Sequence, residues 1–103
     1  MFLGPESPLN GLAKLAEECG ELVQVIGKVM AYGTGPHPDG TESLKARLED
    51  EIADVQAAME LVRHTHGLDG LLIGHRREQK VVLFRQWHLD PDKRTRADPA
   101  VHG

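Results

Sequence analysis

The stretch from Leu44 to Val62 constrains the fold of this chain more than any other part of it. Its large apolar residues recur at steps of three and four, the spacing of one buried face of an α-helix. Glu51 and Asp54 lie along the edge of this face, and at about 100° per residue Glu51 falls within roughly 20° of Leu44. A carboxylate held there is removed from water, which costs on the order of several kcal/mol unless a positive charge pairs with it. The apolar positions are Leu44, Leu48, Ile52, Val55, Met59 and Val62.

A second helix is predicted upstream, over residues 7–32. Ser7 can cap a helix, and Pro8 is tolerated at the first helical position. The apolar side chains of this segment also recur at helical spacing, with Glu18 off the edge of their face and Glu21 further round. The apolar face is predicted to consist of Leu12, Ala16, Cys19, Val23, Ile26 and Met30, with Leu15 and Leu22 beside them.

The remaining segments complete an all-α chain. Residues 33–41 contain several turn-forming residue types and are expected to form a loop. The helix that contains Leu44 to Val62 is expected to start near Thr41 to Ser43 and to end at Gly67, and Asp69 can cap a third helix over residues 70–88. Because no segment alternates apolar and polar residues as a strand does, we expect a helical bundle of about three helices per chain.

The chain is short for such a bundle. Its 103 residues suit one domain over residues 7–88, followed at residues 89–103 by a flexible tail that has little to bury. Two or three helices make a thin core, and the apolar arcs of the first two are wider than one short third helix can cover. We therefore expect a homodimer or homotetramer in which association completes a four-helix core.

Charge and cysteine content limit the partners and the compartment. The formal net charge of -4 argues against general nucleic-acid binding. Residues 1–67 hold 11 acidic and 5 basic residues and the rest of the chain 5 and 7, which suits a metal site followed by phosphate contacts, although two solvated helix faces give the same counts. The single cysteine, Cys19, fits a reducing cytoplasm. No apolar run approaches the ~18 residues of a membrane span, and the first ten residues are not typical of a signal peptide.

Two pairs of carboxylates are the candidates for chemistry. Residues three apart on a helix have Cβ atoms about 5–6 Å apart, so Glu18 with Glu21 and Glu51 with Asp54 form two arms that antiparallel helices can bring face to face. No Lys or Arg is expected between these arms, so the four charges repel one another unless a divalent cation binds. Ligation by oxygen alone favours Mg²⁺, or Mn²⁺, and Glu17 could hold a further ion or a water. On these residues alone, a metal site and an acidic surface seam are equally good interpretations.

The two acidic motifs resemble those of a known enzyme family. EECGE at residues 17–21, followed by EIAD at residues 51–54, is similar to the EExxE…ExxD motif of the MazG-like nucleoside triphosphate pyrophosphohydrolases, members of the all-α NTP pyrophosphatase superfamily. The segment RREQKVVLFRQWH resembles the basic third helix of short, often phage-encoded members. The resemblance covers roughly residues 9–88.

This resemblance implies a function as well as a fold. It implies a bundle completed by oligomerisation, with Mg²⁺ at Glu18, Glu21, Glu51 and Asp54 and with Glu17 helping to hold a further ion or to position water. The reaction would be hydrolysis of a (deoxy)nucleoside triphosphate to the monophosphate and pyrophosphate, in nucleotide-pool control or house-cleaning. A phosphoribosyl-ATP pyrophosphatase-like hydrolase is the nearest alternative, and a non-catalytic helical interaction module is the alternative from another class. Candidate substrate contacts, for which solvent-facing or packing roles are equally good interpretations, are Lys14, Lys28, Arg77, Lys80, Arg85 and, for stacking, Trp87.

Overall fold

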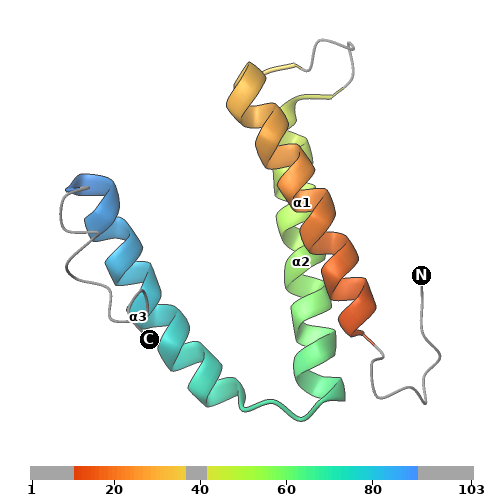
Figure 1. The fold of residues 1–103 in the computed structure, drawn as a ribbon, viewed down its shortest axis with the longest axis vertical. Coiled ribbons are helices and arrows are strands. Elements are labelled where there is room, and N and C mark those ends of the chain that lie inside the picture. Colours follow the sequence, from red (N-terminus) through yellow and green to blue (C-terminus); the bar gives the residue numbers. More distant parts are fainter. Residues whose placement is uncertain (1–10, 37–41, 91–103) are drawn as a thin grey trace. The chain divides into compact units, whose positions relative to one another are not determined.

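The computed structural model describes residues 11–36 and 42–90, and these form helices joined by short connections (Figure 1). The predicted all-α class is confirmed, since the described residues contain no strand and only one isolated β-bridge, between Pro36 and Ser43. None of their helices is long and apolar enough to cross a membrane. The chain divides after Leu68 into two compact units, the first holding α1 and α2 and the second α3. The helices are α1 (Leu12–Tyr32), α2 (Leu44–Thr65) and α3 (Gly70–Leu89).

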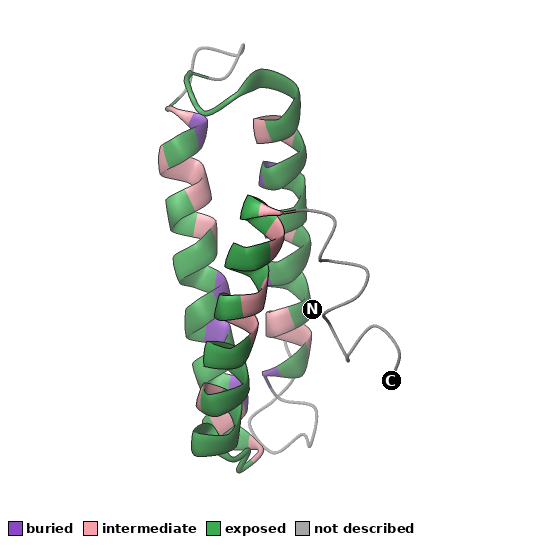
Figure 2. Cartoon of the chain, turned by 90° about the vertical axis from the view of Figure 1, so that its left-hand side faces the viewer, coloured by how far each residue is buried: buried purple, intermediate pink, exposed green. Residues whose placement is uncertain are grey.

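The first unit is a helical hairpin, in which α1 and α2 run antiparallel and side by side (Figures 1 and 2). Buried positions are few along both helices, as the purple segments of Figure 2 show. On α2 they follow the three- and four-residue steps of a single helix face, and Leu48 and Glu51 lie half-buried on the same face. The buried hydrophobic residues of the described chain are Val25, Leu44, Val55, Ala58 and Val62.

The buried face of α2 is rotated slightly from the predicted one. Ile52 and Met59, both predicted to be buried, are 42% and 47% exposed, whereas Ala58 is buried. A small buried side chain such as that of Ala58 allows two helix backbones to approach closely. This rotation moves Glu51 from the edge of the apolar face into it.

The helix α1 meets α2 through a different face from the predicted one. Glu18 and Val25 are its buried residues, and Leu15, Leu22 and Val29 are half-buried. These positions lie about 100° round the helix from the predicted face. Helix α1 therefore has two apolar faces, and the face that contains the Glu18 carboxylate is the one that packs on α2. The members of the predicted face are all exposed in this chain: Leu12, Ala16, Cys19, Val23, Ile26 and Met30.

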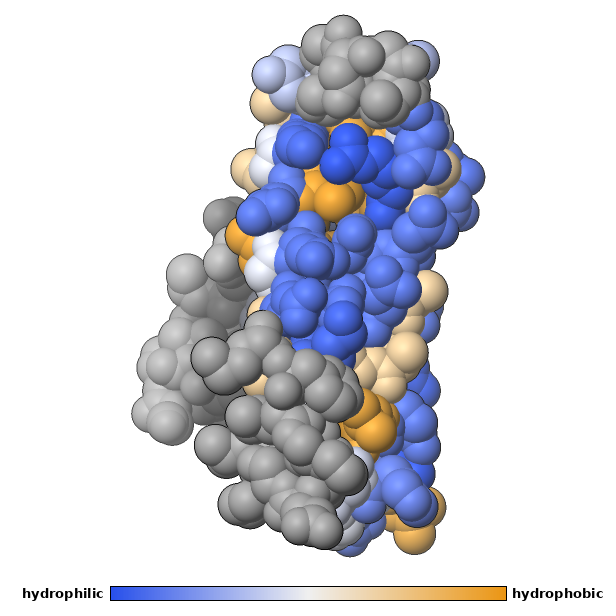
Figure 3. Space-filling view, turned by 90° about the vertical axis from the view of Figure 1, so that its right-hand side faces the viewer, coloured by the Kyte–Doolittle hydropathy of each residue, from blue (hydrophilic) through white to orange (hydrophobic). Residues whose placement is uncertain are grey.

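Several exposed apolar residues of the hairpin lie to one side of its seam, whereas the exposed Leu61 lies on the other side. At about 100° per residue, Val23, Ile26 and Met30 on α1, and Ile52 and Met59 on α2, are rotated by roughly 80–100° in the same sense from the faces in contact. When two helices run antiparallel, positions rotated by the same angle from the contact face, each viewed along its own chain direction, lie on the same side of the pair. By contrast, the face of the molecule seen in Figure 3 is mostly hydrophilic, with hydrophobic residues in separate areas.

The start of α1 differs from the prediction. Gly11 has a φ of 87°, which a right-handed helix does not accommodate, so the helix begins at Leu12. The predicted start at Ser7 lies outside the described residues, but a helix from there could not continue unbroken through Gly11. A Cβ atom at Gly11 would lie 3.4 Å from Cγ2 of Val62 and 3.5 Å from Cδ2 of Leu61. Glycine thus also lets the start of α1 approach the last turns of α2.

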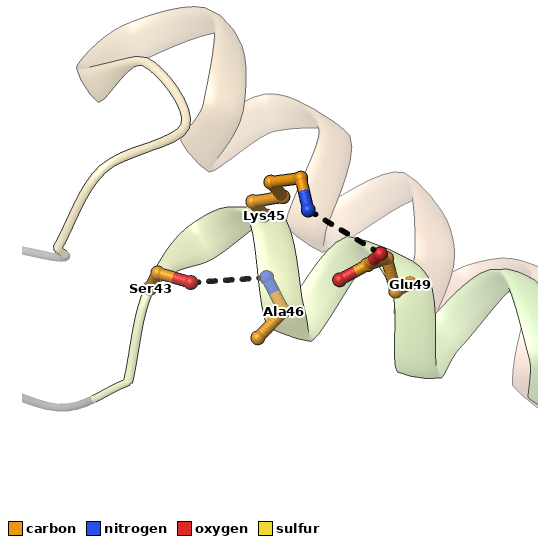
Figure 4. A network of polar contacts seen from close by, with 4 residues as sticks. All are labelled: Ser43, Lys45, Ala46 and Glu49. Atoms are coloured by element: carbon orange, nitrogen blue, oxygen red, sulfur yellow. Dashed lines mark hydrogen bonds and ion pairs between the residues drawn. The ribbon is translucent and has the colours of Figure 1, made fainter.

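The ends of α2 confirm the prediction. Ser43 is the N-cap residue, and its hydroxyl oxygen accepts a hydrogen bond of 3.1 Å from the backbone N–H of Ala46 (Figure 4). One turn on, Lys45 Nζ lies 3.5 Å from Oε2 of Glu49 in an exposed pair. The helix ends at Thr65, and Gly67 follows with a φ of 62°, as expected of a glycine after a helix C-terminus.

Two backbone hydrogen bonds join the ends of the connection between α1 and α2. The N–H of Leu44 donates to the carbonyl of Gly35 at 2.9 Å, and that of Lys45 to the carbonyl of Thr34 at 3.0 Å. The first residues after α1 are therefore held against the first turn of α2. Residues 37–41, including His37, lie outside the described residues.

The second unit contains α3. Oδ1 of Asp69 accepts hydrogen bonds from the backbone N–H groups of Leu71 (3.0 Å) and Leu72 (3.1 Å), which confirms the predicted cap. The helix ends at Leu89, close to the predicted end, and none of its residues is buried. The rings of Phe84 and Trp87 lie 5.1 Å apart between centroids. Most of the predicted tail, from residue 91 onward, lies outside the described residues.

Candidate metal centre

The hairpin brings three of the four predicted metal ligands together. Glu18 comes from α1, whereas Glu51 and Asp54 come from α2, and each offers a carboxylate oxygen that lies within 4.8 Å of the other two. Glu51 and Asp54 share one side of α2 because they are three residues apart. Glu18 faces them because it occupies the surface of α1 that packs on α2. We call these three residues the acidic triad.

The triad is buried at its α1 side and open at its α2 side. Glu18 is only 6% exposed, Glu51 is half-buried and Asp54 is exposed. The Oε2 atoms of Glu18 and Glu51 are both buried, and neither has a hydrogen-bond partner among the described residues. A buried carboxylate oxygen without a partner costs free energy, so these two atoms are the ones that a bound cation would satisfy.

The environment of Glu51 opposes its charge. Removal from water raises the pKa of the Glu51 carboxyl above its ordinary value, and the negative charges of Glu21, Asp54, Glu18 and Asp50 raise it further. Both causes favour the neutral carboxyl while no cation is present. A divalent cation among the carboxylates would act in the opposite direction, because it pairs with the ionised form.

Lys14 supplies a cation beside the triad, where none was expected. Its Nζ atom lies 2.9 Å from Oε1 of Glu18 and 3.7 Å from Oε1 of Glu17. The hydrogen bond to Glu18 and the charge of Glu17 raise the pKa of Lys14. The expectation that no lysine or arginine lies near these carboxylates is therefore wrong. The four-residue step from Lys14 to Glu18, which places both on one side of a helix, could have shown the pair in advance.

Glu21 and Glu17 lie beside the triad and not within it. Glu21 is half-buried, and its carboxylate is not part of the group of mutually close oxygens, although its charge acts on Glu51. The Glu17 side chain is 45% exposed and points about 100° round α1 from Glu18. Both stay predicted ligands or water-holding groups at the margin of the site.

A groove of about 440 Å³ adjoins the triad on the hairpin. Lys14, Glu18 and Asp54 form its polar lining, and Ala57, Ala58 and Leu61 form its apolar lining. These apolar lining residues were not among the site residues predicted from the sequence. Their spacing from Asp54 places them on successive turns of the same side of α2, which is the signal that could have indicated them. The groove offers a ligand both charged and apolar contacts.

Of the other predicted substrate contacts, one lies on the hairpin and four belong to the second unit. Lys28 lies ten residues beyond Glu18, or about 15 Å along the axis of α1. The remaining four are on α3, in the second unit, where Arg77 forms an ion pair of 2.7 Å with Glu78 and Lys80 Nζ lies 6.0 Å from the centre of the Phe84 ring. These four stay predictions: Arg77, Lys80, Arg85 and Trp87.

The donor set of the triad fits a hard divalent cation. It consists of carboxylate oxygens alone, which suit Mg²⁺ or Mn²⁺, whereas zinc usually takes cysteine or histidine. Two oxygens bound to one Mg²⁺ at about 2.1 Å are at most about 4.2 Å apart. The three carboxylates thus need only small side-chain movements to share an ion.

The chain was also compared with known proteins. No family model, no curated protein and no solved structure matches it. The resemblance to the MazG-like enzymes therefore rests on the residues of the two acidic motifs and the segments around them.

Proposed function

We propose that this protein is a Mg²⁺-dependent nucleoside triphosphate pyrophosphohydrolase of the MazG-like type. It would convert a nucleoside or deoxynucleoside triphosphate to the monophosphate and pyrophosphate, in the control of nucleotide pools, and its lone cysteine fits a reducing cytoplasm. The observation that carries the proposal is the acidic triad. Carboxylates from two helices converge there, two of their oxygens are buried without a partner among the described residues, and a groove opens beside them.

Each carboxylate of the site has a proposed role in binding the metal ion or the attacking water. Glu18, Glu51 and Asp54 would hold Mg²⁺, which when bound neutralises charge on the phosphates and lowers the pKa of a water. Glu21 would add a ligand from the margin, and Glu17 would orient the attacking water. The water oxygen would add to the phosphorus of the α-phosphate and release a proton to the solvent, and the bond from that phosphorus to the bridging oxygen would break, so that pyrophosphate leaves. Mn²⁺ would serve as a substitute ion because it takes the same oxygen ligands.

The proposal includes self-association. The described chain buries only five hydrophobic residues, while Val23, Ile26 and Met30 are exposed on one side of the hairpin together with Ile52 and Met59. A second copy that packs on this side would complete a four-helix core, as a homodimer or within a homotetramer. The acidic triad would stay open, since its exposed member and the groove lie on the other side of the seam.

A product analysis tests the proposed reaction. The full chain would be incubated with Mg²⁺ and a panel of nucleoside and deoxynucleoside triphosphates, together with phosphoribosyl-ATP, and the products would be separated by anion exchange. We expect a monophosphate and pyrophosphate in equal amounts from at least one triphosphate. Release of orthophosphate would contradict the proposed cleavage, and turnover of phosphoribosyl-ATP alone would favour the related hydrolase.

One observation favours a non-catalytic helical interaction module. The ion pair between Lys14 and Glu18 compensates part of the triad's charge without any metal. In that case Mg²⁺ should leave the melting temperature unchanged and no nucleotide should be hydrolysed. In the enzymatic case millimolar Mg²⁺ should raise the melting temperature by several degrees, because an ion that binds only the folded state stabilises it.

A further inference from the structure

We infer that Lys14 is a built-in counter-ion of the acidic triad, which a divalent cation displaces from Glu18 and which then contacts the phosphates of the substrate. This inference rests on the proposed function and adds a residue-level step to it. Binding of metal and binding of substrate would be linked through one side chain.

Lys14 lies against the Glu18 carboxylate at the buried side of the acidic triad. Its ammonium group lies 2.9 Å from one oxygen of Glu18, and the second oxygen of the same carboxylate is buried without a partner among the described residues. Glu18 itself is 6% exposed and belongs to the triad, whose oxygens lie within 4.8 Å of one another. The Glu18 carboxylate can therefore bind either the Lys14 ammonium or a metal ion.

The Lys14 ammonium and a divalent cation would compete for the Glu18 carboxylate. A divalent cation bound through Glu18, Glu51 and Asp54 carries two positive charges into a partly buried site, where charges repel more strongly than in water. An ammonium on the same carboxylate would lie only a few ångströms from that ion. A bound metal ion also neutralises part of the negative charge of Glu18, which weakens the attraction between Glu18 and the Lys14 ammonium. Both effects drive the ammonium away from Glu18 when the metal enters.

Once displaced from Glu18, the Lys14 ammonium would remain in the groove. Its side chain is 40% exposed and lines the groove beside the triad, so the ammonium can leave Glu18 without moving the backbone. Lysine is a flexible point charge that suits phosphate oxygens. A triphosphate whose reacting end is held at the triad would extend into this groove, and Lys14 is the cation that lines it.

Manganese binding tests the competition directly. Free Mn²⁺ would be measured by electron paramagnetic resonance in titrations of the wild-type protein and of the Lys14→Gln and Lys14→Met variants, the latter keeping most of the aliphatic stem. We expect both variants to bind Mn²⁺ at least about threefold more tightly, because a competing positive charge is gone. Lys14→Arg keeps the charge and should bind as the wild type does. Lys45→Gln, which removes an exposed lysine that pairs with Glu49, is the matched control and should change nothing.

Steady-state kinetics at saturating Mg²⁺ test the phosphate contact. Lys14→Gln should raise the KM for the triphosphate by about tenfold and change kcat little, as expected when binding is lost equally in the ground and transition states. Lys14→Arg should restore most of the affinity.

The outcomes separate this inference from the proposed function. If the wild-type protein binds Mn²⁺ and hydrolyses a triphosphate, but Lys14→Gln and Lys14→Met bind Mn²⁺ no more tightly, the inference is wrong and the function stands. Tighter metal binding with an unchanged KM would refute the phosphate contact alone. If the wild-type protein neither binds Mn²⁺ nor hydrolyses nucleotides, the proposed function fails and the inference fails with it.

Discussion

Glu18 and Val25 lie two turns apart on α1 and are the buried residues of that helix, with 6% and 4% of their surfaces exposed. The Glu18 carboxylate is thus nearly as buried as the side chain of Val25 in the hydrophobic core. Burial of a charged group costs free energy unless a partner compensates it. In this chain Lys14 compensates one oxygen, and the other is left for a ligand.

Removal of the Glu51 charge should separate a metal site from an acidic seam. We expect Glu51→Gln to be as stable as the wild type, or more stable, in EDTA, because the charge it removes is opposed by burial and by its neighbours. It should lose most of the stabilisation by Mg²⁺ and at least about two orders of magnitude in turnover, since one ligand is missing. Thermal melting with and without Mg²⁺, and turnover of the best triphosphate, are the measurements.

Two further variants complete this comparison. Asp54→Asn should lose the Mg²⁺ effect and turnover in the same way. Glu60→Gln, on the same helix but paired with Arg63 at 3.0 Å, should keep both. Equal and small effects of all three substitutions on Mg²⁺ stabilisation and hydrolysis would identify the carboxylates as a solvated seam.

The stability of the metal-free protein should depend on pH through Glu51. The pKa of Glu51 in the folded protein is raised from the ordinary value of 4.5, so between 4.5 and the raised value the folded state binds more protons than the unfolded state. Its contribution to the free energy of unfolding is therefore greatest below pH 4.5 and decreases as the pH rises through the raised pKa. Urea unfolding in EDTA at several pH values should show wild type losing stability relative to Glu51→Gln as the pH rises.

Glu60 provides a control, because its pKa is shifted in the opposite direction and its contribution to stability should change with pH in the opposite direction. The hydrogen bond from Arg63 lowers the pKa of Glu60. Its contribution is present above pH 4.5 and is lost as the pH falls through the lowered pKa. Wild type should thus lose stability relative to Glu60→Gln on acidification, and the same direction for both variants would show that the effect is not specific to Glu51.

Two glycine substitutions on the first unit should act in opposite directions. Gly11→Ala puts a side chain at a φ of 87° and 3.4 Å from Val62, so it should destabilise the protein by about 1–2 kcal/mol. Gly20→Ala is inside α1, where an added Cβ meets nothing within 4 Å, and it should stabilise by up to about 1 kcal/mol. Chemical denaturation gives both values. A gain of stability in Gly11→Ala would show that the turn before α1 differs from the one described.

Self-association should depend on the exposed apolar side of the hairpin. Ile26 lies on this side and is 41% exposed in the single chain, so Ile26→Glu places a charge there. Sedimentation should show the wild type as a dimer or tetramer at micromolar concentration and the variant shifted to smaller species. Gln24→Glu adds the same charge about 160° round α1 from Ile26 and should sediment as the wild type. A wild type that is monomeric under these conditions would refute the proposed assembly.

Local sequence patterns predicted most of the helical framework. Ser43 and Asp69 cap α2 and α3, and Gly67 follows α2 with a positive φ, because these ends depend on a few neighbouring residues. The helix predicted over residues 7–32 cannot run through Gly11, whose φ of 87° a right-handed helix does not accommodate, and α1 begins at Leu12.

The packing face of α1 could not be predicted from hydrophobicity. The arc with Val23 and Ile26 is more continuous than the arc with Glu18 and Val25, yet the second packs on α2. Such a choice depends on tertiary contacts, including the fit against the small Ala58, and no single-helix pattern contains them. The spacing of the carboxylates showed that Glu18 could face those of α2, whereas the pairing with Lys14 was overlooked.

The hydrogen bonds from Leu44 and Lys45 to Gly35 and Thr34 have a consequence for protein engineering. They fix the two ends of the interhelical connection, so the alignment of α1 with α2 does not depend on the length of chain between residues 36 and 42. Lengthening a connection whose ends are already held costs little, about 0.6 kcal/mol for each doubling of its length. An affinity tag or a fluorescent label inserted there should leave the spacing of the carboxylates unchanged, which makes this connection the place to attach a reporter.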